Sequence, residues 1–278
     1  MKLKRSSRLV DMTGYLLQRP HQIISLSTFS ERYGSAKSSI SEDLGIIKEN
    51  FESQGTGRLV TIAGASGGVK YIPYMEMSDA KELMSLLSGQ LSQSDRLLPG
   101  GYLYMTDILG QPFYINAIGR MISAVYSKDA IDVVMTMETK GIPLAYAVAS
   151  QFNVPVVIVR RSSKVTEGST VSINYVSGSS KRIQTMVLPR RSLTPGSKVL
   201  IIDDFMKAGG TMKGMANLLQ EFDAEVAGMA VFVETKDKAP KLIDGYLSLL
   251  KLSMTEQEQS FAIELGNVFN YYSLEEKI

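Results

Sequence analysis

Two adjacent carboxylates stand at the end of an apolar run in the stretch VLIIDDFMKAGGTM, residues 199–212. The run predicts a buried strand, so Asp203 and Asp204 are expected to emerge at its carboxyl end. Neighbouring carboxylates accept hydrogen bonds from a vicinal diol, such as the hydroxyls of a ribose, or from a hydrated divalent cation. The alternative is a solvated Asp-Asp turn with no ligand.

A loop follows the two carboxylates and leads into the start of a predicted helix. Exposed amides, the positive end of the helix dipole and the Thr211 hydroxyl all favour an anion at this place. Diol acceptors beside an anion site describe a site for a sugar 5-phosphate. The predicted ligand-binding residues of this stretch are Asp203, Asp204, Phe205, Met206, Lys207, Ala208, Gly209, Gly210 and Thr211.

Alternating strands and helices from about residue 100 onward must position these residues. Strands are predicted at 130–137, 154–159, 198–203 and 224–233, and helices at 110–127, 141–152 and 210–222. Such alternation predicts an α/β domain with a parallel sheet, in which ligands bind at the carboxyl ends of the strands. A further helix is expected over 78–91 with Ser78 as its cap, and residues 241–272 are expected to add a helix or strand that finishes the domain.

The first 74 residues carry a different pattern, which predicts a winged helix-turn-helix domain. Amphipathic helices fit residues 7–18, 29–33 and 35–51, with Ser7, Ser27 and Ser35 as caps and Gly34 in the turn. A hairpin follows over 57–74, with a glycine-rich tip at 65–68. The domains are therefore predicted at 1–74 and 75–278.

The N-terminal domain is predicted to bind double-stranded DNA. Residues 1–75 hold ten Lys or Arg and six Asp or Glu, a net charge of +4. In a helix-turn-helix the start of the second helix enters the major groove, and hydroxyls and lysines suit phosphates and base edges. A bundle that docks protein is the alternative. The predicted DNA-binding residues are Arg5, Arg8, Ser35, Lys37, Ser38, Ser39, Arg58 and Lys70.

Composition excludes several classes of function. The 278 residues contain no cysteine, which rules out disulfides and thiolate metal sites and fits a reducing compartment. Apolar runs such as residues 154–159 are far shorter than the roughly 18 residues of a membrane span. The charged N-terminus has no apolar signal core behind it. We therefore expect a cytoplasmic protein that does not enter a membrane.

The stretch 199–212 resembles the signature of the type I phosphoribosyltransferases, which bind phosphoribosyl pyrophosphate (PRPP). The resemblance implies that the two aspartates contact the ribose hydroxyls and that the loop wraps the 5-phosphate. The strand DVVMTM and the following ETKGIPLAYAVA resemble the pyrophosphate-contacting loop of that family. This likeness assigns pyrophosphate to Glu138, Thr139, Lys140 and Gly141.

Residues 160–192 are basic, polar and rich in Ser and Gly, as expected of the mobile flap over such a site. Arg160 is a predicted ligand-binding residue there. Tyr102, just before the α/β elements, is a candidate to stack on a base, although a tyrosine is more often part of a core. A bound anion would cancel positive potential from the flap if that surface also faces DNA, and reordering of the flap is the alternative route to DNA release. The flap cations are Arg160, Arg161, Lys164, Lys181 and Arg182.

The chain departs from the transferase pattern at two positions. Ala208 stands where family members usually carry Thr or Ser, so a hydroxyl donor to the phosphate is missing. Lys207 often corresponds to a small residue and here adds positive charge. We interpret these changes as retained binding with altered chemistry.

The whole chain resembles the purine operon repressor family of Gram-positive bacteria. The resemblance implies a dimeric transcription factor whose DNA binding is relieved by PRPP. Mg²⁺ is expected only as a companion of PRPP, because the sequence shows no dedicated metal cluster. Guanosine tetraphosphate could place its diphosphate in the same site. The alternative is an active purine phosphoribosyltransferase with an appended domain. Ala208 and the fused DNA-binding module favour a sensor that is not an enzyme.

Overall fold

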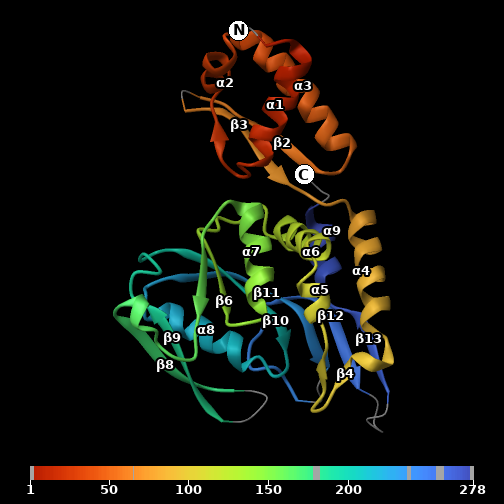
Figure 1. Cartoon of the computed structure of the whole chain (residues 1–278), viewed down its shortest axis with the longest axis vertical. Helices are drawn as coiled ribbons and strands as arrows, with labels where there is room; N and C mark the ends of the chain where they lie inside the picture. The colour runs from red at the N-terminus through yellow and green to blue at the C-terminus, as the bar shows by residue number, and fades with distance from the viewer. Residues whose placement is uncertain (1–2, 65, 178–181, 237–238, 255–259, 276–278) are drawn as a thin grey trace. The chain divides into compact units, whose positions relative to one another are not determined.

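The structure is a computed structural model that describes residues 3–64, 66–177, 182–236, 239–254 and 260–275 (Figure 1). The chain divides into two compact units, one of residues 1–76 with 150–153 and one of residues 77–149 with 154–278. Within the described residues, no helix combines the length and the apolar character that crossing a membrane requires.

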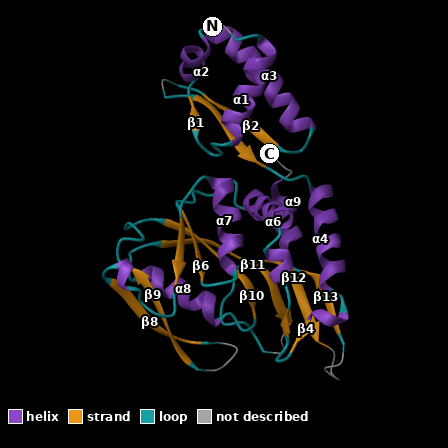
Figure 2. Ribbon diagram, in the orientation of Figure 1, coloured by secondary structure: helices purple, strands orange, loops and turns teal. Residues whose placement is uncertain are grey.

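The first unit has the helix-turn-helix and hairpin that the sequence predicts (Figure 2). Gly34 has a φ of +58° and ends one helix in the left-handed conformation that glycine tolerates best. The three strands form an antiparallel sheet in the order β1-β3-β2. The elements are α1 Arg5–Leu17, β1 Ile23–Ile24, α2 Leu26–Tyr33, α3 Lys37–Ser53, β2 Gly57–Ile62 and β3 Gly68–Pro73.

The apolar positions of the three helices meet in one core. The predicted stripe of α3 is buried, with Ile40 fully inaccessible and Phe51 only 4% exposed. These residues pack with Met12 and Leu16 of α1 and with Phe29 of α2. Burial of these side chains is the main stabilising contribution of the unit, at about 25 cal/mol per Å² of apolar surface.

None of the four serines predicted to cap helices does so. The α1 and α3 helices begin after Lys4 and Ala36, neither of which makes a side-chain cap, and Ser25 caps α2 by accepting a hydrogen bond from Thr28 N at 3.1 Å. A serine-rich sequence offers several possible cap residues near each helix start. Residue type alone therefore does not show which of them is the N-cap. The predicted caps that proved wrong are Ser7, Ser27, Ser35 and Ser78.

The second unit is built on a six-stranded sheet in the order β13-β12-β11-β10-β6-β7. Its strands are β6 Val133–Met137, β7 Val156–Val159, β10 Lys198–Met206, β11 Glu225–Lys236, β12 Leu247–Met254 and β13 Phe261–Leu265. All are parallel except the edge strand β13. The remaining elements are α4 Met77–Leu91, a 3₁₀ turn Ser94–Arg96, β4 Leu97–Leu98, β5 Tyr102–Leu103, α5 Thr106–Leu109, α6 Pro112–Val125, α7 Gly141–Phe152, a 3₁₀ turn Val165–Glu167, β8 Thr170–Val176, β9 Ile183–Pro189, α8 Gly210–Gln220 and α9 Val268–Glu275.

The strand order reverses between β6 and β10. From β6 the chain crosses outward to β7, whereas β10, β11 and β12 follow one another in the opposite direction. A crevice forms outside the carboxyl ends of parallel strands at such a reversal, and it is the usual ligand site of this class of sheet. The predicted parallel sheet is therefore confirmed, with the antiparallel β13 as an addition.

Alternating side chains of the sheet and the inner face of α8 form the core beneath this crevice. Met135 and Ile201 belong to a buried cluster with Met212 and Met215 of α8. The same cluster includes Tyr175 of the hairpin β8–β9, a separate two-stranded sheet. The segment predicted to be a flap thus carries a folded hairpin that packs on α8 along its length.

Candidate functional site

Asp203 and Asp204 lie at the point where β10 loses one of its two neighbours. Pairing with β6 ends at Ile202 opposite Thr136, whereas pairing with β11 continues to Met206. The sequence predicts that this strand ends at Asp203. It continues for three more residues, to Met206, because it stays paired with β11. Asp203 is only 7% exposed, and its Oδ1 accepts a hydrogen bond from Asp204 N at 3.0 Å.

The environment of the two carboxyl groups favours their protonated forms. Burial raises the pKa of Asp203 well above its ordinary value, and the charge of Asp204 adds to the increase. Burial also raises the pKa of Asp204, while the ammonium of Lys140 partly offsets this. Hydrogen-bond donors that reach the ionised pair would therefore be strongly stabilising.

A cavity of about 550 Å³ opens over the two aspartates, a volume typical of small-molecule sites. One part of its wall is polar and the other is apolar. The polar residues are Glu138, Lys140, Arg161, Ser177, Gln184, Asp203, Asp204 and Thr211, and the others are Leu98, Pro99, Tyr102, Leu103, Met105, Met137, Tyr175 and Phe205.

The loop of residues 207–209 and the start of α8 border a small hollow of about 70 Å³ on one side of Asp203. Gly209 has a φ of +82° and stands just before the helix, where a side chain would be strained. The amides at the start of α8 are suited to an anion. The hollow is lined by Tyr102, Asp203, Phe205, Met206, Lys207, Ala208, Gly209, Gly210, Thr211 and Met212.

A second hollow, of about 390 Å³, lies beside Asp204 and is lined by Glu138, Thr139, Lys140 and Arg161. Gly141 does not line it, but it allows the loop to approach the aspartates. A Cβ at Gly141 would lie 2.2 Å from Thr136 Oγ1 and 3.6 Å from Asp203 Oδ1. Only a glycine fits at this close approach.

Arg160, a predicted ligand-binding residue, is engaged in two ion pairs beside the cavity. Its guanidinium binds Glu138 at 3.1 Å and Glu167 at 2.7 Å, and it does not line the cavity. The next residue, Arg161, lines both the cavity and the larger hollow. The Arg161 amide and the Arg160 guanidinium also hold the pKa of Glu138 below its usual value. Arg160 thus ties the flap to the 138–141 loop. Another predicted flap cation, Lys181, lies outside the described residues.

Tyr102 lies at the cavity and not in the core. The residue is 43% exposed, and its ring centroid lies 5.8 Å from that of Phe205. The Lys207 ammonium lies 4.5 Å from the Tyr102 ring and donates a hydrogen bond to Gly100 O at 2.5 Å. The aromatic ring is therefore available to a base, and Lys207 links it to the loop of residues 207–209.

The hairpin contributes cavity residues that sequence reasoning missed. Tyr175 OH donates to Gln184 Oε1 at 2.7 Å, and both residues lie in the cavity wall with Ser177. Alternation along β8 and β9 could have shown which residues share a face. It could not have shown that this face turns toward Asp203.

No dedicated metal centre is found in the part of the chain that the structure describes. No group of three or more His, Cys, Asp or Glu residues is arranged there to hold a metal ion. The two carboxylates of Asp203 and Asp204 could still contact the water shell of a cation that arrives bound to a ligand.

In the first unit, the start of α3 presents the predicted contact residues with different degrees of exposure. Lys37 and Ser38 are exposed, and Ser39 is half-buried. The Ser35 hydroxyl donates to Tyr33 O at 3.3 Å, so it is tied to the preceding turn. On the hairpin, Arg58 stacks 4.2 Å from the Tyr74 ring, Lys70 is half-exposed, and Ala65 of the predicted tip lies outside the described residues.

Arg8 is buried, which corrects the expectation that its side chain faces DNA. Its guanidinium donates to Asp43, which is fully inaccessible, and to Ser35 Oγ at 3.2 Å. Arg5 binds the same carboxylate at 2.9 Å and also lies 3.7 Å from Glu42. Burial would raise the pKa of Asp43, but the hydrogen bonds from Arg8 and Arg5 overcome it and hold that pKa below its usual value.

Comparison with known proteins agrees with this two-part organisation. The family described as "Bacterial purine repressor, N-terminal" matches residues 4–73, and the phosphoribosyl transferase domain family matches residues 105–266. The purine biosynthesis transcriptional repressor of Bacillus subtilis is 59% identical over 273 residues, which cover 98% of this chain and 96% of that protein. The chain belongs to the bacterial purine repressor family.

Relatives of this purine repressor family member carry names of different functions. The purine biosynthesis transcriptional activator of Lactococcus lactis is 48% identical over 96% of this chain and 99% of that protein. A xanthine phosphoribosyltransferase of Lachnoclostridium phytofermentans is 29% identical over 54% of this chain and 80% of that enzyme. The Bacillus subtilis and Lactococcus lactis relatives, which cover both units, are named as transcriptional regulators, and this supports a regulator and not an enzyme.

The fold of the second unit is that of a phosphoribosyltransferase. An adenine phosphoribosyltransferase structure from Rhodothermus marinus superposes with a TM-score of 0.52 at 20% identity, covering 62% of this chain and 99% of that one. At this level of identity the match establishes the fold alone. The predicted fold class, an N-terminal helix-turn-helix domain with a transferase-like α/β domain, is confirmed.

Proposed function

We propose that the protein is a DNA-binding repressor of purine biosynthesis and transport genes and that PRPP relieves its binding to DNA. The helix-turn-helix, with Lys37 and Ser38 exposed at the start of α3, supports DNA as the partner. The Bacillus subtilis relative is named as a repressor and the Lactococcus lactis relative as an activator. We propose repression because this chain is more similar to the Bacillus subtilis protein.

The arrangement of the two hollows is the observation that carries the PRPP assignment. Asp203 borders the hollow at the start of α8, and Asp204 borders the hollow of the 138–140 loop. PRPP has its diol between a 5-phosphate and a pyrophosphate. Diol acceptors that lie between two anion sites match this order of groups.

Magnesium enters this proposal as a companion of the pyrophosphate. The described residues offer no resident metal site, and the two aspartates are suited to the water shell of a cation. The ion would lower the charge of the pyrophosphate and would be lost with the ligand.

Guanosine tetraphosphate is proposed as a competitor at the same site. Its diphosphate could occupy the hollow beside Asp204, and its base could stack on the exposed ring of Tyr102. Competition with PRPP for the purified protein tests this assignment, and simultaneous binding of the two ligands would contradict it.

The effect of PRPP on DNA binding follows from linkage. A ligand weakens DNA binding only if it binds better to the DNA-free form. Anionic PRPP would cancel positive potential from Lys140 and Arg161, and any such loss weakens attraction to phosphates. A homodimer is expected, because helix-turn-helix proteins usually read paired half-sites with two-fold symmetry.

The first test uses Asp203→Ala and Asp204→Ala, with Asp79→Ala on the exposed face of α4 as the control. Both site variants should bind operator DNA like the wild type and lose the response to PRPP. We expect a wild-type response of roughly tenfold, within the usual range of coupling between sites. Affinity for DNA at fixed salt, measured by fluorescence anisotropy with and without PRPP, decides the matter. Site variants that still respond to PRPP like the control would contradict the proposal.

A further inference from the structure

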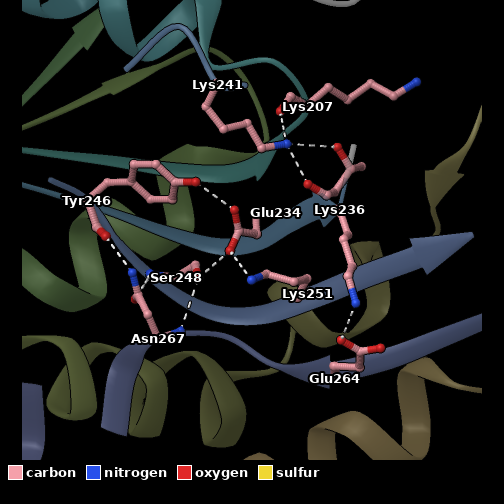
Figure 3. Close-up of polar contacts among 10 residues, drawn as sticks. Lys207, Glu234, Lys236, Lys241, Tyr246, Ser248, Lys251, Glu264 and Asn267 are labelled. Carbon is pink, nitrogen blue, oxygen red and sulfur yellow. Dashed lines mark hydrogen bonds and ion pairs between the residues drawn. The ribbon is translucent and has the colours of Figure 1, made fainter. Parts of the chain in front are cut away.

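A segment that is distant in sequence supports the loop of residues 207–209 from behind. Residues 241–243, called here the backstop, contact this loop residue by residue. Figure 3 shows the first contact, in which the Lys241 ammonium lies against the backbone carbonyl of Lys207. A charged donor makes this hydrogen bond stronger than one between neutral groups.

The next two residues of the backstop contact the next two residues of the loop. Leu242 N donates a hydrogen bond to Ala208 O at 2.8 Å. A Cβ built on Gly209 would lie 3.0 Å from Ile243 Cγ2, so the isoleucine side chain packs on the glycine backbone. The backstop therefore fixes the position of all three loop residues.

Two loop amides are oriented as a result. In a trans peptide the C=O and the following N–H point in opposite directions. Because the carbonyls of Lys207 and Ala208 face the backstop, the amides of Ala208 and Gly209 point away from it. No described group accepts a hydrogen bond from these two amides, and both residues line the hollow of about 70 Å³. They are the donors that an anion in this hollow would meet.

The first residue of the backstop and Tyr246, which follows it, are both tied to the end of β11. Lys241 also donates to the carbonyl of Thr235 and lies 3.3 Å from its Oγ1, at the end of β11. The adjacent Glu234 is 5% exposed and accepts hydrogen bonds from Tyr246 OH at 2.6 Å and Ser248 Oγ at 2.8 Å (Figure 3). Contacts with β11 on either side of residues 242–245 restrain the position of the backstop.

We propose that Lys241 is a positioning residue for the 5-phosphate of the ligand. It does not touch the ligand, but it holds the loop so that the amides of Ala208 and Gly209 are aimed at the phosphate. Its ammonium also places a positive charge behind the loop. This inference rests on the proposed function, because it assumes a sugar 5-phosphate in the smaller hollow.

The experiment compares Lys241→Met with Lys236→Met, which removes an exposed lysine that pairs with Glu264 at 3.4 Å. Calorimetry of the full chain measures binding of ribose 5-phosphate, a probe of the 207–211 loop, and of inorganic pyrophosphate, a probe of the 138–141 loop. Lys241→Met should weaken ribose 5-phosphate binding about tenfold and change pyrophosphate binding less than twofold. Lys241→Arg, which keeps the charged donor, should recover most of the loss.

The outcomes separate this assignment from the proposed function. Unchanged binding of ribose 5-phosphate to Lys241→Met, or equal losses for both probes, would overturn the role of Lys241 alone. Wild-type protein that binds neither PRPP nor ribose 5-phosphate would overturn the proposed function and this inference with it. If Lys241→Met does not fold, Ile243→Ala provides the test, and a loss confined to ribose 5-phosphate is again the expected result.

Discussion

At the scale of single residues, the site buries two neighbouring carboxyl groups, which is unfavourable for folding. Asp203 is buried on a central strand, and its nearest acidic neighbour is the next residue. Both features raise its pKa, with burial the larger cause. Such a residue is expected to reduce stability in exchange for ligand binding.

We predict that Asp203→Asn stabilises the ligand-free protein at pH 7 by roughly 1 kcal/mol, as is common when a costly functional residue is neutralised. Because the folded-state pKa is raised, the protonated carboxyl stabilises the fold at low pH. That contribution is lost as the pH rises through the folded-state pKa. The advantage of the variant should therefore shrink toward pH 4. Urea unfolding at both pH values measures it, and a variant less stable than the wild type at pH 7 would contradict the account.

The local residues of the site could be predicted from sequence, but those brought in by the fold could not. Asp203 and Thr211 were predicted from the chemistry of one short stretch, and Lys140 from the likeness of its loop to that of the transferases; all three line the cavity. Gln184 reaches the cavity only because the hairpin folds beside Asp203, and Lys241 acts through contacts with a loop 34 residues away. No periodicity or spacing indicates such contacts.

At the scale of elements, a buried ion pair joins two helices of the first unit. Asp43 lies three residues after Ile40 and four before Ile47, so it stands on the apolar face of α3. Arg8 of α1 neutralises it there. The spacing could have revealed the buried acid, but the sequence gives no indication of which arginine pairs with it.

Removal of Arg8 should destabilise the first unit. Arg8→Met leaves the Asp43 carboxylate buried with only the exposed Arg5, and we expect a loss of about 3 kcal/mol. Arg5→Met, on an exposed side chain, should cost less than about 1 kcal/mol. Hydrogen exchange of the α1 and α3 amides in the full chain measures both effects. An Arg8→Met variant with unchanged exchange and abolished DNA binding would instead make Arg8 a DNA contact.

Element types were more predictable than their ends. Apolar runs identified β6, β7, β10 and β11 because both faces of a parallel sheet are buried. The strands β12 and β13 lay in a segment expected only to add a helix or strand. Helix starts were wrong wherever serines were abundant, since the true N-caps Lys4 and Ala36 are not typical cap residues.

At the scale of the whole molecule, the chain combines a helix-turn-helix unit with a transferase-like unit, whose cavity we propose binds a phosphoribosyl ligand. Binding free energy that is not used for group transfer can instead shift a conformational equilibrium. If PRPP weakens DNA binding as we propose, linkage requires DNA to weaken PRPP binding by the same factor. This reciprocity holds whichever route couples the two sites.

The measurement that tests this account most directly is a titration of PRPP against a complex of the protein with DNA from upstream of purine biosynthesis genes. Salt must be held fixed, because phosphate contacts make DNA affinity strongly salt-dependent. We predict tight, specific binding that PRPP weakens by roughly tenfold or more. Specific binding that is unchanged by saturating PRPP, or no specific binding at all, would contradict the account.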